Sequence, residues 1–251
     1  MSISLDLTGT TAVVTGARRG IGFAMAEALA MAGADIIAAS TRQEADGGAI
    51  GGRVRELGRA FEGHAVDFTD REAVRAFGDA VRDRADILVN NAGTIRRSPA
   101  AEHPLEWWDE VLDVNLRSQF VLTQTVGASM VERGGGRIIF TASLLSFQGG
   151  INVPGYTAAK SGVVGLVKAL SNEWSRHGVT VNAIAPGYIA TDNTAALRAD
   201  EDRSQAILER IPAGRWGRPA DLQGATAFLA SPAAAYVTGV TLPVDGGWMA
   251  R

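Results

Sequence analysis

The sequence contains no cysteine, few histidines and little excess charge, and each shortage excludes a class of protein. Without cysteine there is no disulfide, no thiolate metal site and no cysteine nucleophile. The three histidines, His64, His103 and His177, are scattered and lack the spacing of metal ligands, so we expect no metal. The net charge of −3 gives no electrostatic reason to expect a nucleic-acid partner.

Targeting and membrane-spanning segments are also missing from the sequence. The first residues, MSISLDLTGTTAVVTG, lack a basic stretch followed by an apolar one, so they do not resemble a signal peptide. No apolar run approaches the roughly 18 residues that a membrane-spanning helix needs. With 46% hydrophobic and 20% charged residues, the chain is predicted to be globular, soluble and cytoplasmic, with no membrane partner.

Short runs rich in β-branched residues alternate with segments of helical length. The runs are continuously apolar, which is typical of parallel strands that helices cover on both faces. The expected strands are Thr11–Thr15, Asp35–Ser40, His64–Asp67, Asp86–Asn90, Arg137–Ala142, Thr180–Ile184 and Thr241–Val244. Helices are expected over Gly22–Ala32, Asp70–Arg82 and Gly155–His177, among others. This alternation predicts one α/β domain over residues 1–251, a Rossmann-type doubly wound parallel sheet of about seven strands.

One segment interrupts the alternation. Thr191–Pro219 is a charged, helical insert between the sixth and seventh expected strands. Ligands of open parallel sheets bind beyond the carboxyl ends of the strands, so an insert placed there is expected to be a substrate lid.

The first expected strand leads directly into a glycine-rich turn, TGARRGIG, over Thr15–Gly22. Gly16 permits a tight turn, Gly20 lets the backbone approach a pyrophosphate, and Gly22 lets the following helix pack closely on the sheet. The N-terminus of that helix offers N–H groups to phosphates. This order of strand, turn and helix predicts a dinucleotide site.

The end of the second expected strand leaves the choice between NAD and NADP open. A carboxylate that holds the ribose 2′-hydroxyl is usual there, but the place is taken by Ser40. Asp35 lies about 16 Å back along the strand and cannot substitute for it. Arg18, Arg19 and Arg42 are near enough in sequence to meet a 2′-phosphate.

A tyrosine and a lysine stand one helical turn apart in PGYTAAKSGV. Tyr156 and Lys160, at positions i and i+4, share a helix face. An ammonium about 5 Å from a phenol, at an effective dielectric constant of 20, lowers the phenol pKa by roughly two units. Such a pair is suited to proton transfer near neutral pH, although the same spacing also arises by chance.

Further motifs follow in a fixed order. NNAG covers Asn90–Gly93, DVNLRS contains Asn115, and TASLLSFQGG places Ser143 13 residues before Tyr156. Together with TGARRGIG, YTAAK, the Pro186–Gly187 pair and VDGG near the C-terminus, these motifs resemble the short-chain dehydrogenase/reductase family from end to end.

The resemblance implies an NAD(P)-dependent oxidoreductase that acts on CH–OH groups. It implies that Tyr156 is the general acid/base, that Lys160 is its electrostatic partner, that Ser143 holds the substrate oxygen and that Asn115 fixes a water. The residues expected at the cofactor are Gly16, Arg18, Arg19, Gly20, Ile21, Gly22, Ser40, Asp67, Phe68, Asn90, Ala92, Gly93, Tyr156, Lys160, Pro186, Gly187, Ile189 and Thr191. NAD is the expected cofactor and NADP the alternative, because Thr41 directly follows Ser40 and Arg42 stands one step further, on the other strand face.

Longer segments, such as NNAGTIRR and ERIPAGRWGRP, resemble family members that act on sugar acids such as 2-keto-3-deoxygluconate or 2-deoxygluconate. A guanidinium should hold the carboxylate of such a substrate, and the candidates are Arg96, Arg97, Arg203 and Arg215, with Arg97 or Arg203 favoured. The residues expected at the substrate are Arg97, Ser143, Gln148, Tyr156, Asn193 and Arg203.

Two other functions are kept open. An NADPH-dependent 3-ketoacyl-carrier-protein reductase, or a general carbonyl reductase, would carry a similar glycine-rich turn. A catalytically idle nucleotide sensor on the same fold would have lost Tyr156, Lys160 or Ser143, and all three are present. The family resemblance also implies a homotetramer, assembled through helices near Val111–Gly127 and Gly155–Trp174.

Overall fold

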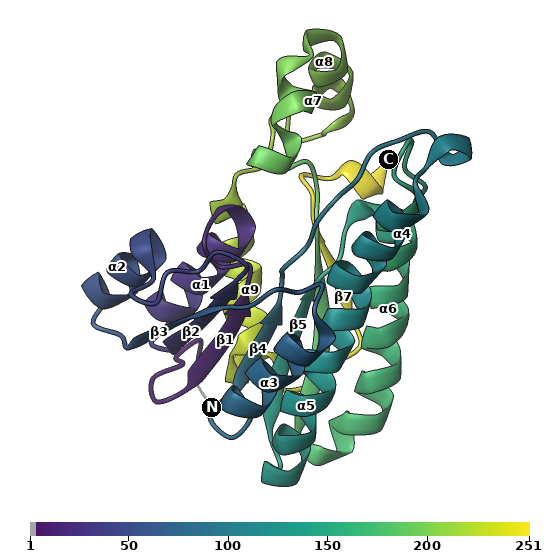
Figure 1. The fold of residues 1–251 in the computed structure, drawn as a ribbon. Coiled ribbons are helices and arrows are strands. Elements are labelled where there is room, and N and C mark those ends of the chain that lie inside the picture. The colour runs from purple at the N-terminus through teal and green to yellow at the C-terminus, as the bar shows by residue number, and fades with distance from the viewer. Residues whose placement is uncertain (1–3) are drawn as a thin grey trace.

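A parallel sheet forms the centre of the computed structural model, which describes residues 4–251 (Figure 1). Its strands are β1 (Thr11–Thr15), β2 (Asp35–Ser40), β3 (Phe61–Ala65), β4 (Ile87–Asn90), β5 (Gly136–Thr141), β6 (Val179–Pro186) and β7 (Thr241–Val244). The seven strands lie in the order β3-β2-β1-β4-β5-β6-β7, and every neighbouring pair is parallel. The doubly wound parallel sheet expected from the sequence is therefore confirmed.

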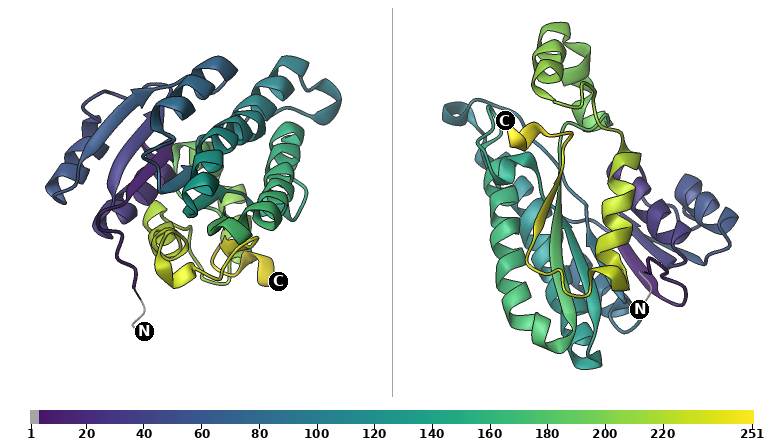
Figure 2. Two further views of the ribbon diagram at one scale, coloured as in Figure 1. Left: turned by 90° about the horizontal axis from the view of Figure 1, so that it is seen from below. Right: turned by 180° about the vertical axis from the view of Figure 1, so that it is seen from behind.

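Helices cover both faces of this sheet (Figure 2). One face carries α3 (Arg71–Val81), α5 (Ser118–Arg133) and α6 (Pro154–Trp174), and α4 (Leu105–Leu112) packs on α6. The other face carries α1 (Gly20–Met31), α2 (Gly48–Glu56) and α9 (Gln223–Ala230). Short 3₁₀ turns lie at Ala100–Glu102, Leu144–Ser146, Ser175–His177, Asp192–Thr194, Pro219–Leu222, Pro232–Ala234 and Trp248–Ala250.

The central strands carry runs of consecutive apolar residues because successive side chains enter two different cores. In β1, Val13 belongs to the core under α3, α5 and α6, whereas Val14 belongs to the core under α1, α2 and α9. Ile138 and Ile139 of β5 divide in the same way. Side chains of a strand alternate between faces, so a strand covered on both sides has a nearly continuous apolar run.

The edge strand β3 is the element that the sequence located least well. Its sequence is FEGHA, and it ends at Ala65, so the expected range His64–Asp67 is wrong by about half a strand. Glu62 forms an ion pair with Arg84, and four of the five strand residues are only partly buried. Such a strand lacks the apolar run that identifies the central strands.

The insert rises beyond the carboxyl ends of the strands (Figure 1). It contains α7 (Ala195–Ala199) and α8 (Glu201–Arg210). A small third core joins its base to the rest of the molecule, in which Ile211 packs with Leu144 and with Trp248 from the C-terminal turn. Among residues 4–251, no helix combines the length and the apolar character needed to cross a membrane.

Candidate active site

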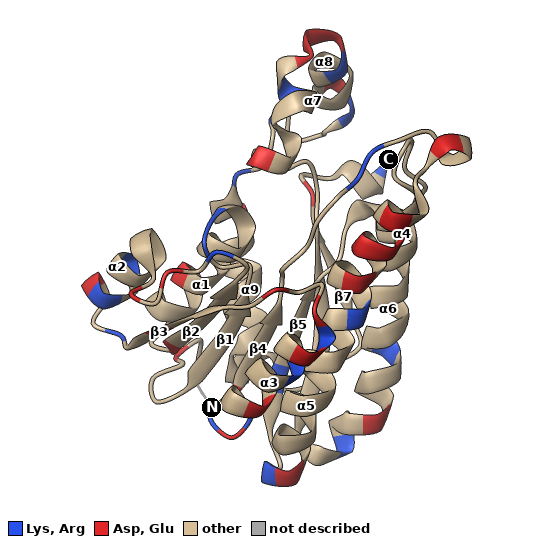
Figure 3. Cartoon of the chain, in the orientation of Figure 1, with Lys and Arg blue, Asp and Glu red and all other residues tan. Residues whose placement is uncertain are grey.

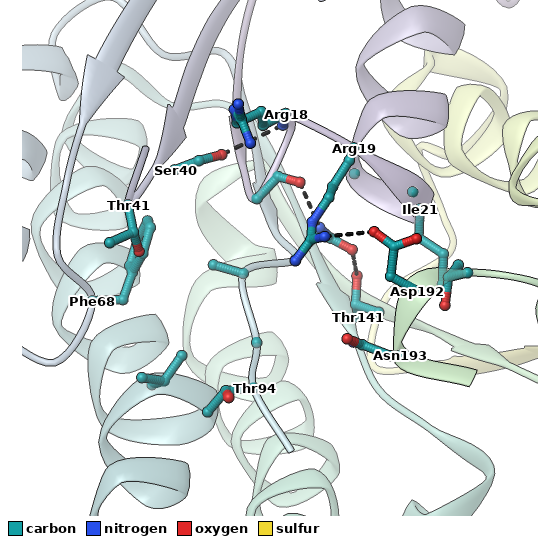
Figure 4. Close-up of a pocket in the computed structure, with 18 of the residues that line it drawn as sticks. Arg18, Arg19, Ile21, Ser40, Thr41, Phe68, Thr94, Thr141, Asp192 and Asn193 are labelled. Atoms are coloured by element: carbon teal, nitrogen blue, oxygen red, sulfur yellow. Dashed lines mark hydrogen bonds and ion pairs between the residues drawn. The ribbon is translucent and has the colours of Figure 1, made fainter. Parts of the chain in front are cut away.

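A cleft of about 690 Å³ opens beyond the carboxyl ends of the strands, near the boundary of β1 and β4 (Figure 4). Strand order reverses at this boundary, which is where open α/β sheets bind their ligands. The lining residues are Gly16, Arg18, Arg19, Gly20, Ile21, Gly22, Ser40, Thr41, Arg42, Asp67, Phe68, Thr69, Asn91, Ala92, Gly93, Thr94, Glu110, Val114, Thr141, Tyr156, Lys160, Thr191, Asp192 and Asn193.

The glycine-rich turn closes one end of the cleft, and its geometry requires glycine. Gly16 and Gly20 have φ values of 70° and 59°, in the left-handed region that other residues rarely adopt. A Cβ atom on Gly22 would lie 2.2 Å from the Gly16 carbonyl oxygen. Helix α1 begins at Gly20, and its N-cap residue Arg19 makes no side-chain cap within the described chain, so the first N–H groups remain available to an anion. The turn therefore fits the pyrophosphate of a dinucleotide.

Asn91, the second residue of NNAG, fastens the end of β4 to this turn and was not among the expected site residues. Its Nδ2 donates to the carbonyl oxygen of Thr15 at 3.0 Å, and its backbone N–H donates to the Thr15 hydroxyl at 2.9 Å. Asn90, which was expected at the cofactor, is instead buried behind the cleft wall and donates to the Thr123 hydroxyl. The strand alternation at this point decides which asparagine faces the ligand.

The far end of the cleft is formed by the ends of β2 and β3. Ser40 is 8% exposed, and its hydroxyl accepts from the backbone N–H of Arg18 at 3.4 Å. Asp67 accepts from the backbone N–H and hydroxyl of Thr69, and these hydrogen bonds lower the pKa of its carboxyl group. Phe68, the next residue in the chain, also lines the cleft. This end has the polar and aromatic groups that an adenosine would contact.

Tyr156 and Lys160 lie together on the first turns of α6. The Lys160 side chain is 2% exposed, and its Nζ donates to the carbonyl oxygen of Thr141 at 2.6 Å. Nζ also lies 5.7 Å from the centre of the Tyr156 ring. Burial lowers the pKa of Lys160 to about 8, because a charged ammonium is poorly solvated there.

The pKa of Tyr156 moves in the direction opposite to the expected one. Burial raises it above the usual value, while the Ser143 hydroxyl and the Arg97 guanidinium oppose the rise. A nearby ammonium by itself would lower the phenol pKa, but burial also removes water from the phenol, and that loss raises the pKa. In the protein without a bound nicotinamide, desolvation is the larger effect.

Ser143 follows β5 and caps the 3₁₀ turn Leu144–Ser146. Its Oγ accepts from the backbone N–H of Leu145 at 3.2 Å, and Ser146 Oγ donates to the Lys160 carbonyl oxygen at 2.7 Å. The capping bond uses a lone pair of Ser143 and leaves its O–H free to donate. The turn therefore orients this hydroxyl and ties it to the helix that carries Tyr156.

Asn115 stands in a π-helical turn, Asp113–Arg117, between α4 and α5. Its Oδ1 accepts from the Thr94 backbone N–H at 2.8 Å, and its Nδ2 donates to the Thr94 carbonyl oxygen at 2.7 Å. These bonds hold the loop after NNAG against the helix, and they leave one N–H and one lone pair that a water can use. Isolated π-turns of this kind are frequent at functional sites.

The four candidate carboxylate anchors differ in their partners. Arg96 makes two hydrogen bonds to Glu110, and Arg215 makes two to Asp221, so both guanidinium charges are matched. Arg97 donates only to the backbone carbonyl oxygen of Asn193, at 3.2 Å, among the residues that the structure describes.

Arg203 is exposed on α8. Burial raises the pKa of the half-buried Tyr188, and the positive charge of Arg203 is near enough to oppose this rise.

Several expected site residues lie away from the main cleft. Gln148 accepts from the Trp248 indole N–H at 3.4 Å, which places it at the base of the insert. Ile189 is 4% exposed and lines a separate cavity of about 180 Å³. Pro186 ends β6, and Gly187 packs so tightly that an added Cβ would lie 2.6 Å from the Cα of Asp245.

The beginning of the insert closes over the cleft from the side. Arg19 of the glycine-rich turn pairs with Asp192 at 2.5 Å, and Thr191 lies 3.6 Å from the position of a Cβ on Gly20. Arg97 contacts the 3₁₀ turn Asp192–Thr194 through the backbone carbonyl oxygen of Asn193. Residues 4–251 contain no cluster of three or more acidic, histidine or cysteine side chains that could hold a metal ion.

The fold and this cleft define a doubly wound dinucleotide-binding oxidoreductase. A family model described as enoyl-(acyl carrier protein) reductase matches residues 16–249, and the chain belongs to the short-chain dehydrogenase/reductase family. The sequence-based identification of the family is thereby confirmed.

Three relatives show where in the family the chain lies. It is 58% identical to a 2-dehydro-3-deoxy-D-gluconate 5-dehydrogenase of Pseudoalteromonas atlantica, over 98% of both chains. A 3-oxoacyl-(acyl-carrier-protein) reductase of Vibrio cholerae is 43% identical, over 97% of this chain and 98% of the other. The crystal structure of a gluconate 5-dehydrogenase from Burkholderia cenocepacia, in complex with NADP and tartrate, has a TM-score of 0.94 at 38% identity and covers 99% of this chain and 98% of its own.

Proposed function

We propose that the protein catalyses the reversible oxidation of a secondary alcohol of a sugar acid, 2-keto-3-deoxygluconate (2-dehydro-3-deoxy-D-gluconate) or a close relative, with NAD or NADP as cofactor. The name of the 58% identical relative supports the substrate class. The complex of the Burkholderia protein with NADP and with tartrate, a dicarboxylate, supports a nicotinamide dinucleotide as cofactor and a ligand that carries a carboxylate.

The position and the contacts of Arg97 are the main support for an acidic substrate. Its guanidinium is near enough to oppose the rise of the Tyr156 pKa, and Tyr156 lines the cleft. Its neighbour Arg96 is neutralised by Glu110, whereas within residues 4–251 Arg97 donates only to a backbone carbonyl group of the insert. A cation of this kind can exchange that carbonyl for a substrate carboxylate, and a charge-assisted hydrogen bond is the stronger of the two. A neutral carbonyl substrate has no carboxylate with which the Arg97 guanidinium could pair.

The chain's own residues can perform the proton transfer. The Ser143 hydroxyl donates a hydrogen bond to the substrate oxygen, and the Tyr156 phenol exchanges the proton of that oxygen. Lys160, with its pKa of about 8, stabilises the phenolate while its Nζ remains bonded to Thr141. When bound, the nicotinamide supplies the hydride acceptor and a second positive charge near the phenol. The positive charge of a bound nicotinamide would offset the desolvation that raises the Tyr156 pKa in the free protein.

NAD is the preferred cofactor, and residues 191–219 act as a substrate lid, supported by the contacts of Asp192 with Arg19 and of Asn193 with Arg97. A cytoplasmic homotetramer assembled through α4, α5 and α6 stays a prediction. Exposed Leu105 on α4 and Phe120 on α5 are consistent with a covered surface there.

Arg97→Ala tests the substrate class, with Arg96→Ala as the matched control. For 2-keto-3-deoxygluconate, Arg97→Ala should raise KM about tenfold to a hundredfold, the effect of losing a charge-assisted hydrogen bond. A neutral hydroxyketone of similar length should change less than about threefold, and Arg96→Ala should affect neither substrate by more than that. Equal losses for acid and neutral substrates would reject the sugar-acid function in favour of a general carbonyl reductase.

A further inference from the structure

An ion pair stands at the end of the cleft where the adenosine ribose would lie. Arg18 Nε donates to both carboxylate oxygens of Glu44 at 3.2 Å, and its Nη2 donates to Oε1 at 3.0 Å. This contact raises the pKa of Arg18 and lowers that of Glu44. The glycine-rich turn appears as a basic segment in Figure 3, but both of its arginine charges are matched, Arg18 by Glu44 from the loop after β2 and Arg19 by Asp192 of the insert.

Arg18 also contacts Ser40, which stands where a carboxylate would hold the ribose 2′-hydroxyl of NAD. Its backbone N–H donates to Ser40 Oγ, and Figure 4 shows the two side by side at the cleft wall. Ser40 is neutral, so it neither repels a 2′-phosphate nor holds a 2′-hydroxyl as a carboxylate would. The charge of this subsite is consequently set by its neighbours, Arg18, Arg42 and Glu44.

These neighbours sum to one net positive charge. Arg42 lines the cleft and has no carboxylate within ion-pair distance among residues 4–251. Arg18 contributes a second positive charge, which Glu44 cancels while occupying the Nε edge of the guanidinium. A 2′-phosphate is a dianion, so it would have to share Arg18 with a carboxylate of the same sign.

Backbone contacts hold Glu44 in this place. Its carbonyl oxygen accepts from the Gly47 N–H at 2.9 Å, and a Cβ atom on Gly48 would lie 3.3 Å from its carboxylate. Gly47 and Gly48 both have positive φ values, 85° and 51°. The loop thus folds back so that Glu44 faces Arg18.

We propose that Glu44 is a specificity-determining residue, which lowers the affinity of the ribose subsite for a 2′-phosphate and so keeps NAD preferred while NADP is still accepted. The inference rests on the dinucleotide site of the proposed function and does not depend on the identity of the substrate. It assigns the preference to a residue outside the glycine-rich turn and outside the end of β2.

Binding of two adenosine fragments to the purified full-length protein tests the inference without any turnover. Adenosine 2′,5′-bisphosphate and 5′-AMP differ only in the 2′-phosphate, and calorimetric titration measures both affinities. Glu44→Gln should strengthen binding of the bisphosphate about fivefold at low salt and change 5′-AMP less than twofold, the size expected for one exposed charge. The gain should shrink at high salt because both groups are exposed.

Glu56→Gln is the matched control. Glu56 is an exposed carboxylate on α2 that pairs with Arg53, so the substitution removes the same charge away from the cleft and should leave both affinities unchanged. The kcat/KM ratio for NADP over NAD should rise with Glu44→Gln by the same factor as the fragment affinities.

Three outcomes would overturn the inference. Weaker binding of the bisphosphate by Glu44→Gln would mean that Glu44 orients Arg18 for the phosphate instead of opposing it. An equal change for both fragments would assign Glu44 a role in shaping the adenosine site without discrimination. Failure of the wild type to bind 5′-AMP would reject the dinucleotide site itself, a result that is distinct from the other two.

Discussion

Replacing Lys160 by methionine should remove activity and at the same time stabilise the folded protein near neutral pH. The buried ammonium has a pKa of about 8 in place of 10.5, and at 1.36 kcal/mol per unit this shift costs the folded state about 3 kcal/mol. Methionine fills a similar volume without charge, but it leaves the Thr141 carbonyl oxygen without its donor, at a cost of about 1–3 kcal/mol. We therefore expect the variant to be between equal in stability and about 2 kcal/mol more stable at pH 7.

The pH dependence of this difference identifies its cause. Below pH 8 the lysine is charged in both the folded and the unfolded state, so the full cost of burying the charge is present. Between pH 8 and 10.5 the folded protein has released the proton while the unfolded chain still holds it, and the stability of the wild type rises with pH. Relative to the methionine variant, the wild type should gain about 2.5 kcal/mol between pH 7 and pH 10.

Urea unfolding of the apoprotein at pH 7 and pH 10, followed by tryptophan fluorescence, measures this difference. Lys168→Met is the matched control, because it removes an exposed lysine from the same helix. A difference between wild type and Lys160→Met that stays constant with pH would refute the reasoning. So would a variant that is less stable than the wild type at pH 7 by more than about 3 kcal/mol, the upper cost of the lost hydrogen bond.

Two further predictions concern the same cleft. Tyr156→Phe should retain dinucleotide binding, seen by fluorescence titration, and lose two to four orders of magnitude in kcat, about the contribution of general acid–base catalysis; turnover near the wild-type rate would mean that another group moves the proton. Gly22→Ala should abolish dinucleotide binding in the same titration, because its Cβ would lie 2.2 Å from the Gly16 carbonyl oxygen and 2.4 Å from Asn91 Nδ2. Gly52→Ala is its control in the open part of α2, where an added Cβ meets nothing within 4 Å, and unchanged binding by Gly22→Ala would exclude a close approach of the turn to the pyrophosphate.

The local arrangement of the site was predictable from the sequence. Tyr156 and Lys160 share a helix face because of the period of the helix. The turn after the first strand is rich in glycine because it needs positive φ values. The doubly wound sheet followed from continuous apolar runs separated by helices. These properties depend on a few consecutive residues or on a repeated pattern, and a sequence displays both directly.

Contacts between distant residues decided the rest. Arg96 and Arg97 are indistinguishable in the sequence, yet within the described chain only Arg96 meets a carboxylate, that of Glu110 on α4. Glu44 finds Arg18 across 26 positions, and Lys160 finds the Thr141 carbonyl oxygen at the end of β5. The Tyr156 pKa rises because packing removes water from the phenol, and no spacing along a chain encodes the amount of water that packing removes. The sequence thus determined which chemical groups the site contains, while charge balance and desolvation were decided by tertiary structure, because both depend on every element that packs around a group.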